Sequence, residues 1–322
     1  MTYPKDITAR KEKTRGFCNT LVSLLIVFLF LGFSYFFSDE LSAYVISGLK
    51  LCFYTVIGSV FPFLILCDII LSFSHFDRAP LFRRVFTKLF NVNGYAVSAY
   101  ICGVLCGFPI GMKVASELYN AGYISREECE RLIGFSNNTG PSFVISGIGL
   151  GLRKSITDGF LLYISMIVSS IAVGIILGIG KTPTDIAAVR KKEEFRLNLS
   201  IKNAALNTLN ICAFVVFFSV VCGVLKLWLG RLKIYPFLLP IFEVSNAARI
   251  LAESQSLTRG ISLILTAFAV SFSGLSVHMQ GHTFLQGFGI SMKKYYIAKL
   301  MQGVFASLFI LAILVLSPAL SG

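Results

Sequence analysis

The chain has 322 residues, of which 55% are hydrophobic and only 14% are charged, and its formal net charge is +13. Apolar runs of membrane-spanning length recur along it, which excludes an ordinary soluble domain and indicates a polytopic helical membrane protein. The basic residues fall in short segments between these runs, where they act as topology signals and not as a nucleic-acid surface.

The positions of the cysteines indicate a role in core packing. The eight cysteines lie mostly inside apolar runs, and no two of them form a CxxC pair. We interpret them as small buried hydrophobic residues, without disulfides or metal ligation. They are Cys18, Cys52, Cys67, Cys102, Cys106, Cys129, Cys212 and Cys222.

The N-terminal part begins with a polar, basic tail, residues 1–16, followed by an apolar run at 17–37. This run is long for a signal peptide and no clear small-residue cleavage site follows it, so we expect an uncleaved first span with a cytoplasmic N-terminus. Asp39 and Glu40 then mark the outer side, and an interfacial turn carries Lys50.

A second span is expected at 51–73, with a kink at Pro62. The loop 74–94 that follows is rich in basic residues and should be cytoplasmic. Its basic residues include Arg78, Arg83, Arg84 and Lys88.

The apolar segment 95–119 is interrupted at Gly107-Phe108-Pro109-Ile110-Gly111. Each arm has roughly a dozen residues, too few to cross about 30 Å of hydrocarbon, so the segment is either a re-entrant hairpin or one kinked span. The largest basic cluster of the chain lies at 181–203, and only the hairpin places this cluster on the inside. We therefore predict a hairpin.

The segment 131–151 is apolar but is broken at its centre by Ser136-Asn137-Asn138-Thr139-Gly140-Pro141. Proline and glycine free backbone groups that lipid cannot satisfy, so we expect a discontinuous helix lining a polar cavity. Ser125 and Glu128 have the spacing of a capping box at the start of this helix. The helix should leave the membrane near Arg153 and Lys154, a weak exception to the positive-inside rule.

The second half repeats this order. Spans are expected at 159–180 and 204–229, with a short interrupted pair of arms at 234–253 and a broken helix at 261–285. The last span, 296–320, follows two inner lysines and leaves the C-terminus outside.

From Gly107 to Ser136 is 29 residues, and from Glu243 to Phe272 is also 29. Because each half has three full crossings, the second copy should be inserted upside down, as in transporters built from inverted repeats. The predicted fold class is therefore all-α: a polytopic membrane protein with inverted repeats, two re-entrant helical hairpins and two discontinuous transmembrane helices. The predicted parts are the tail 1–16, an additional helix 17–37, a first repeat 41–180, a basic cytoplasmic linker 181–203 and a second repeat 204–320.

The hairpin tips and helix breaks should converge on one site, because ionisable and polar residues inside a membrane are functional candidates by default. Glu243 is either part of the site or pairs with Arg249, and Lys113 either offers a cation to an anionic substrate or pairs with Glu117. The predicted substrate-binding residues are Gly107, Pro109, Gly111, Lys113, Asn137, Asn138, Thr139, Glu243, Ser245, Asn246, Ser273, Ser276 and Gln280.

Ser273, Ser276 and Gln280 are spaced to share one helix face. His278 and His282 have the i,i+4 spacing of a metal pair, but no third ligand is near, so no metal is expected. No Walker A loop, GxSxG motif or soluble catalytic domain is present, so we expect no enzyme and no cofactor, and the coupling ion is left open.

Several motifs together resemble the sporulation integral membrane protein YlbJ family, of the nucleoside-recognition or Gate-domain group. The motifs are Gly107-Phe108-Pro109-Ile110-Gly111-Met112-Lys113, Glu117-Leu118-Tyr119, Ile124-Ser125-Arg126-Glu127-Glu128, Ser136-Asn137-Asn138-Thr139-Gly140-Pro141-Ser142-Phe143, Phe242-Glu243-Val244-Ser245-Asn246 and Phe272-Ser273-Gly274-Leu275-Ser276-Val277-His278-Met279-Gln280. The match covers about residues 50–320, and the scaffold is similar to that of concentrative nucleoside transporters.

The resemblance implies a role in sporulation, as a transporter or facilitator that moves dipicolinate, a small anionic heteroaromatic metabolite, across the outer forespore membrane of a bacterial cell. A sodium- or proton-coupled nucleoside transporter and a non-transporting sporulation scaffold or gate are the alternatives. The partners expected are the lipid bilayer and a small-molecule substrate, without nucleic acid, and the chain could form a homo-oligomer.

Overall fold

A computed structural model describes residues 35–73, 80–184, 196–232 and 234–317. This part of the chain consists of helices joined by short connections, without strands, and it includes four helices long and apolar enough to cross a membrane, or up to six if two bent pairs each form one span. The prediction of an all-α polytopic membrane protein is therefore confirmed. The predicted tail 1–16 and nearly all of the first span lie outside the described residues.

The second span is longer than predicted. Helix α2 (Ser38–Leu51), a π-helical turn (Cys52–Val56) and α3 (Ile57–Phe73) follow one another without a break, so the expected interfacial turn at Lys50 is wrong. No proline interrupts residues 38–51. Gly48 of α2 packs closely against Ser219 of α9 (Leu197–Leu229), because a Cβ at Gly48 would lie 2.8 Å from the serine oxygen. The long helix bends by 43° just before Pro62, whose missing N–H accounts for the predicted kink.

The predicted loop 74–94 is largely a helix, α4 (Pro80–Phe90). Phe86 and Phe90 recur at a spacing of four and are buried against the core, while Arg84 and Lys88 on the opposite side of the helix are exposed. This amphipathic pattern stabilises a short helix that the count of basic residues alone did not predict.

The first interrupted segment is a hairpin, as predicted. Its arms are α5 (Val97–Cys106) and α6 (Ile110–Asn120). A Cβ on Gly103 would lie 3.1 Å from the Cα of Gly111, so the two arms run side by side and the alternative of one kinked span is wrong.

The discontinuous helix is also confirmed. Helix α7 (Arg126–Ser136) begins with the predicted capping box, in which Ser125 and Glu128 exchange hydrogen bonds. Four residues, 137–140, are outside any helix, and a π-helical segment, η4 (Ser142–Leu152), completes the passage.

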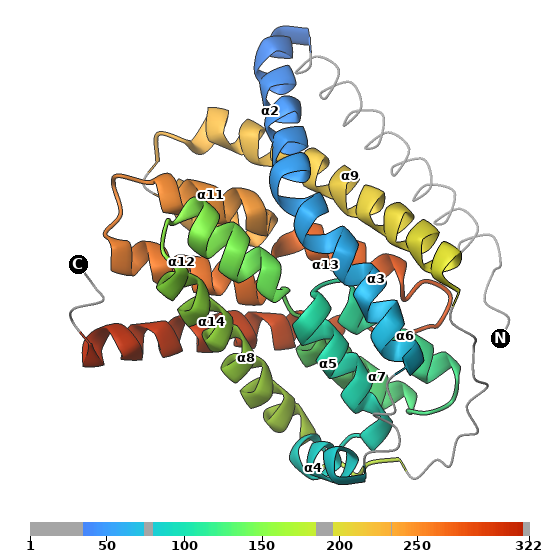
Figure 1. Cartoon of the computed structure of the whole chain (residues 1–322). Coiled ribbons are helices and arrows are strands. Elements are labelled where there is room, and N and C mark those ends of the chain that lie inside the picture. Colours follow the sequence, from blue (N-terminus) through green and yellow to red (C-terminus); the bar gives the residue numbers. More distant parts are fainter. Residues whose placement is uncertain (1–34, 74–79, 185–195, 233, 318–322) are drawn as a thin grey trace, which may run out of the picture.

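The second half has the same sequence of elements. Helix α8 (Ile156–Gly178) leads towards α9, which begins at Leu197, seven residues earlier than predicted, so the end of the linker is helical; residues 185–195 lie outside the described part. A hairpin of α10 (Tyr235–Phe242) and α11 (Val244–Glu253) follows, and then a second discontinuous helix, α12 (Arg259–Phe272) and α13 (Gly274–Thr283). Helix α14 (Lys293–Leu316) completes the fold (Figure 1).

Ion pairs identify one end of the bundle. Glu127 at the start of α7 pairs with Lys181 beyond the end of α8 at 2.8 Å, and Glu130 pairs with Lys294 at the start of α14 at 3.3 Å. We call this the Glu127 end.

The opposite end of α8 carries a second ion-pair cluster. Asp158 in its first turn accepts hydrogen bonds from Arg153 at 2.9 Å and from Arg259, at the start of α12, at 2.7 Å. Since α8 has 23 residues and is about 34 Å long, α7 and α12 begin at opposite ends of the molecule. The pairing also gives a reason for the predicted exception at Arg153, because Asp158 offsets its charge.

The core has two parts that meet along α8 and α14. One part surrounds the first hairpin and α7, with Val173 and Tyr295 among its members. The other surrounds the second hairpin and α12, with Met166 and Ile310. A cavity between the two hairpins is thus enclosed by both halves of the chain.

Candidate functional site

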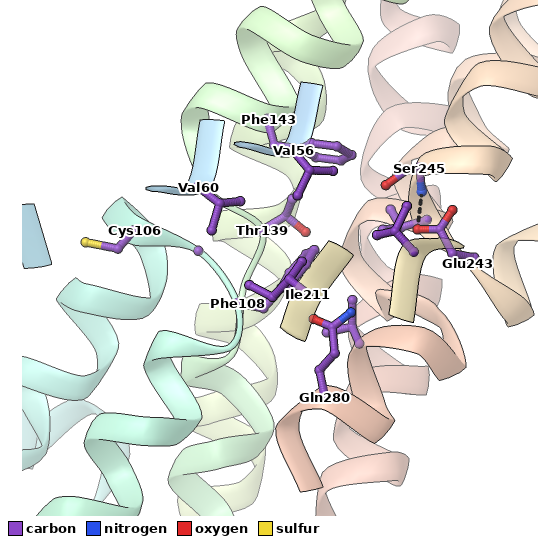
Figure 2. Close-up of a pocket in the computed structure, with 15 residues that line it drawn as sticks. Val56, Val60, Cys106, Phe108, Thr139, Phe143, Ile211, Glu243, Ser245 and Gln280 are labelled. Atoms are coloured by element: carbon purple, nitrogen blue, oxygen red, sulfur yellow. Dashed lines mark hydrogen bonds between the residues drawn. The ribbon is translucent and has the colours of Figure 1, made fainter. Parts of the chain in front are cut away.

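Both hairpin tips, the first helix break and α13 line one cavity of about 450 Å³, including the solvent at its mouth. Figure 2 shows Phe108 of the first tip, Thr139 of the first break and Glu243 of the second tip around it. Its full lining is Val56, Val60, Cys106, Gly107, Phe108, Thr139, Gly140, Phe143, Ile211, Val215, Glu243, Val244, Ser245, Val277 and Gln280.

Each tip packs against the break of its own half. Gly107 has a φ of +85° and ψ of −176°, a conformation open essentially only to glycine, and a Cβ there would lie 2.6 Å from the nitrogen of Gly140. In the second half, Gly274 has a φ of +75°, and a Cβ there would lie 3.1 Å from the nitrogen of Glu243. Side chains at these glycines would separate each tip from its break.

Glu243 occupies the N-terminus of α11 and is 1% exposed. Its carboxylate accepts hydrogen bonds from the backbone N–H groups of Ser245, at 2.9 Å, and Asn246. These bonds and the helix dipole offset its negative charge. Arg249 donates to the side chain of Asn246 at 3.3 Å, so the structure gives Glu243 a capping role instead of the alternative pair with Arg249.

Asn246 links the second hairpin to α9. Its side-chain amide donates to Ser219 Oγ and to Glu243 Oε2, both at 2.9 Å. Ser245 lines the cavity, whereas Asn246 lies behind Glu243 and holds its carboxylate in place.

The first break is surrounded by buried polar side chains. Lys299 of α14 donates to the backbone oxygen of Asn137 at 2.9 Å and to Gln302 Oε1 at 2.7 Å. Gln302 in turn donates to Asn138 Oδ1 at 2.7 Å and to the Met166 carbonyl oxygen at 3.3 Å. Lys299, Gln302, Asn137 and Asn138 are all 0% exposed, so this network satisfies the freed carbonyl of Asn137 and the side chain of Asn138 away from water.

The network continues from Asn137 towards the second half. Asn137 Nδ2 donates to the Tyr295 hydroxyl at 3.1 Å, and that hydroxyl is 2.9 Å from His278 Nδ1 on α13. Thr139 donates to the backbone oxygen of Val270 in α12 at 2.8 Å. The first break therefore contacts α12 directly and is linked to α13 through Tyr295.

Sequence reasoning missed Tyr295, Lys299 and Gln302. A lysine and a glutamine three residues apart inside the predicted last span, 296–320, were the available sequence feature, because polar residues there normally face a bundle interior.

Lys113 lies away from the cavity. Its ammonium group is 3.7 Å from Asp68 of α3 and 3.9 Å from Glu117 of the same helix. Of its two predicted roles, the geometry gives it the ion pair.

The remaining predicted residues divide between tip packing and the second break. Pro109 ends the first tip, and Gly111 lets α6 approach the Ser136 carbonyl oxygen. Ser273 adopts the left-handed conformation and is fully buried. Gln280 donates to Ser276 Oγ at 3.2 Å, which confirms that the two share one face.

Gln280 also faces the cavity, and its side-chain oxygen is buried without a hydrogen-bond partner among the described residues. The cavity thus brings together Gly107, Thr139, Glu243, Ser245 and Gln280 from the predicted set. The substrate-binding role of these residues stays a prediction.

At the Glu127 end, outside the membrane-spanning segments, Glu128 connects three loops. Burial opposes its charge, but hydrogen bonds from Thr184, Ser125 and the backbone of Asn93 together lower the pKa of this carboxyl group. An ionised Glu128 therefore ties the start of α7 to the segments before α5 and after α8.

The chain is similar in sequence to a known membrane protein. The chain is 26% identical to sporulation integral membrane protein YlbJ of Bacillus subtilis (strain 168) over an alignment of 318 residues, which covers 82% of this chain and 75% of the relative. No family model matches the chain, and no solved structure matches it. The similarity to the YlbJ protein confirms the predicted resemblance to its family.

Proposed function

We propose, with the similarity to sporulation integral membrane protein YlbJ as the premise, that this chain is a transporter or facilitator for a small anionic or heteroaromatic metabolite. The specific candidate is dipicolinate, a pyridine dicarboxylate, which would cross the outer forespore membrane during sporulation. No catalytic step and no cofactor belong to this function.

One observation carries the proposal: a single cavity is lined by both hairpin tips and both discontinuous helices. Helix breaks inside a membrane are tolerated where they line a cavity, and transporters use them to form substrate sites near the midplane. A purely structural protein would gain nothing from exposing unwound backbone to such a space.

The arrangement of the ends supports alternating access. Because α7 and α12 begin at opposite ends of α8, the hairpin before each of them also lies towards a different end. We take the two halves to be an inverted repeat, 41–180 and 204–320, whose relative movement would open the cavity to one side at a time.

The lining of the cavity suits a flat aromatic ligand with polar edges. Phe108 and Phe143 provide aromatic surface, while Thr139 and Gln280 provide hydrogen-bonding groups. The unpartnered Gln280 oxygen fits a bound water that donates one hydrogen bond to it and the other to a carboxylate of the ligand.

Lys299 gives one electrostatic argument for an anion over a neutral nucleoside. Glu243, which lines the cavity, has backbone donors for its carboxylate, whereas Lys299, which does not line it, has only neutral oxygens as partners among the described residues. A buried ammonium group without a carboxylate leaves a positive field that attracts a negative substrate.

Uptake of labelled dipicolinate into proteoliposomes tests the proposal. We expect uptake above that of empty liposomes, competition by unlabelled dipicolinate stronger than by uridine, and at least a tenfold reduction in Gln280→Leu. Lys293→Ser, an exposed site on α14, serves as the matched control and should transport normally.

Two outcomes would separate the alternatives. Preferential competition by uridine would indicate a nucleoside transporter. Absence of uptake from folded protein, together with loss of sporulation on deletion of residues 185–195 and none with Gln280→Leu, would support the scaffold instead.

A further inference from the structure

The surroundings of Lys299 resemble a cation site more than an ion pair. Its ammonium group contacts a backbone carbonyl oxygen of unwound helix, that of Asn137, and the amide oxygen of Gln302. The adjacent Asn137 Oδ1 is buried and has no hydrogen-bond partner among the described residues. Two neutral oxygens therefore hold the ammonium group at a position that is fully removed from water.

Carbonyl and amide oxygens of this kind are the ligands that a sodium ion prefers in transporters. In transporters with discontinuous helices, carbonyl groups freed by the unwinding coordinate the coupling sodium ion. Here the same kind of carbonyl receives an N–H from a covalently attached cation. Lys299 and a sodium ion could not occupy this position together, because the ammonium lies 2.9 Å from the carbonyl oxygen that the ion would need.

A purely structural role does not explain why a lysine is buried beside the first break. Holding the break in place requires only hydrogen-bond donors, and a neutral glutamine, such as Gln302 beside it, provides them without the cost of burying a charge. Lys299 is 0% exposed and reaches the break from α14, a helix that packs against both halves. A lysine side chain buried at the junction of the two halves therefore requires a reason beyond packing.

We infer that the ammonium group of Lys299 is a built-in replacement for a coupling sodium ion, so that transport by this chain does not require sodium. The inference rests on the proposed transport function and specifies its driving conditions. The hydrogen bond from Lys299 would hold the first break in the unwound state that a bound ion would otherwise stabilise. Dissociation of an ion would then not be a step of the transport cycle.

The first test measures thermal unfolding of the purified full chain in sodium, potassium and choline chloride at equal ionic strength, without substrate. The wild-type protein should unfold at the same temperature in all three salts. Lys299→Ser removes the charge and opens the oxygen cluster, so sodium should stabilise this variant by about 2 °C more than potassium at ten times its Kd. The control Lys293→Ser, exposed on the same helix, should show no preference.

Two results would overturn the inference: sodium-specific stabilisation of the wild-type protein, or a folded Lys299→Ser variant that treats sodium and potassium alike. The wild-type measurement remains decisive if the variant does not fold. Uptake of dipicolinate provides the second readout, and its rate should change less than twofold when sodium is replaced by choline.

These readouts also separate the two proposals. Absence of uptake in every salt, with unfolding of the wild-type protein indifferent to sodium and a sodium preference in Lys299→Ser, would reject transport of this substrate while retaining the cation replacement. Uptake that is abolished without sodium would retain transport and reject the replacement.

Discussion

The two helix breaks differ in how their open backbone is satisfied. In the first, four residues, 137–140, leave the helix, and side chains of α14 reach in to bond them. In the second, only Ser273 interrupts the helix before α13 begins at Gly274. A long break inside a membrane leaves several backbone groups that need polar partners from elsewhere in the fold. A one-residue break leaves few such groups, because the helical hydrogen bonds resume at the next residue.

This difference assigns different roles to the two halves. The first break depends on a polar network that extends through Asn137 to Tyr295 and His278, so its state is sensitive to movements of α14 and α13. The second break depends mainly on the backbone conformation of Ser273 and Gly274. We expect the first to respond to ligands and the second to act as a fixed bend, and matched substitutions in the two halves test this.

The largest difference in stability is expected when alanine replaces the glycine that packs each hairpin tip against its helix break. Gly107→Ala should lower the free energy of unfolding by about 4 kcal/mol, because it combines a glycine-only conformation with a clash against Gly140. Gly274→Ala should cost about 2 kcal/mol, since its closest contact is 3.1 Å. Chemical unfolding in detergent measures both, and equal losses would contradict the comparison.

Two buried glutamines provide the next pair. Gln302→Leu removes bonds to Asn138, Met166 and Lys299, so a loss of about 3 kcal/mol is expected. Gln280→Leu removes only the bond to Ser276 and should cost about 1 kcal/mol, while reducing transport more strongly. The ranking would be refuted if Gln280→Leu proved the more destabilising of the two.

Two hydroxyl groups point at the same carbonyl oxygen, that of Val270. Thr139 donates to it at 2.8 Å and Ser273 at 3.4 Å. Thr139→Val should cost about 1.5 kcal/mol and Ser273→Ala about 0.5 kcal/mol, because the longer bond is weaker. In the double mutant, the loss of unfolding free energy should differ from the sum of the two single losses, because in each single mutant the remaining hydroxyl still donates to the Val270 carbonyl oxygen. Strictly additive losses would argue against the shared acceptor.

The smallest effect concerns pH and the helix cap of α7. The pKa of Glu128 is lowered in the folded state, so its contribution to stability is present above the unfolded pKa of about 4.3 and is lost as pH falls through the lower folded value. Glu128→Gln should therefore be less stable than the wild-type protein at neutral pH, with a difference that narrows below about pH 4. Melting curves between pH 3 and 7 measure this, and an unchanged difference would exclude Glu128 as its source.

Much of the fold could be predicted from local composition. Glycine and proline at 107–111 and at 140–141 interrupt apolar runs that lipid would otherwise hold helical, so the hairpin and the break followed from the chain itself. The helix at Pro80–Phe90 and the continuous passage through Lys50 did not follow, because counting charges describes the side of the membrane and not the local backbone.

The sequence by itself determined which segments lose their helical hydrogen bonds, since that depends on residue type at each position. Only the tertiary structure decided which side chains provide the replacement partners. Lys299 and Gln302 are more than 160 residues from Asn137 and Asn138 along the chain, yet Lys299 donates to the Asn137 carbonyl and Gln302 to the Asn138 side chain. In a membrane this choice of partner is restricted by the absence of water. A freed carbonyl group must find its donor in whichever helix packing brings alongside.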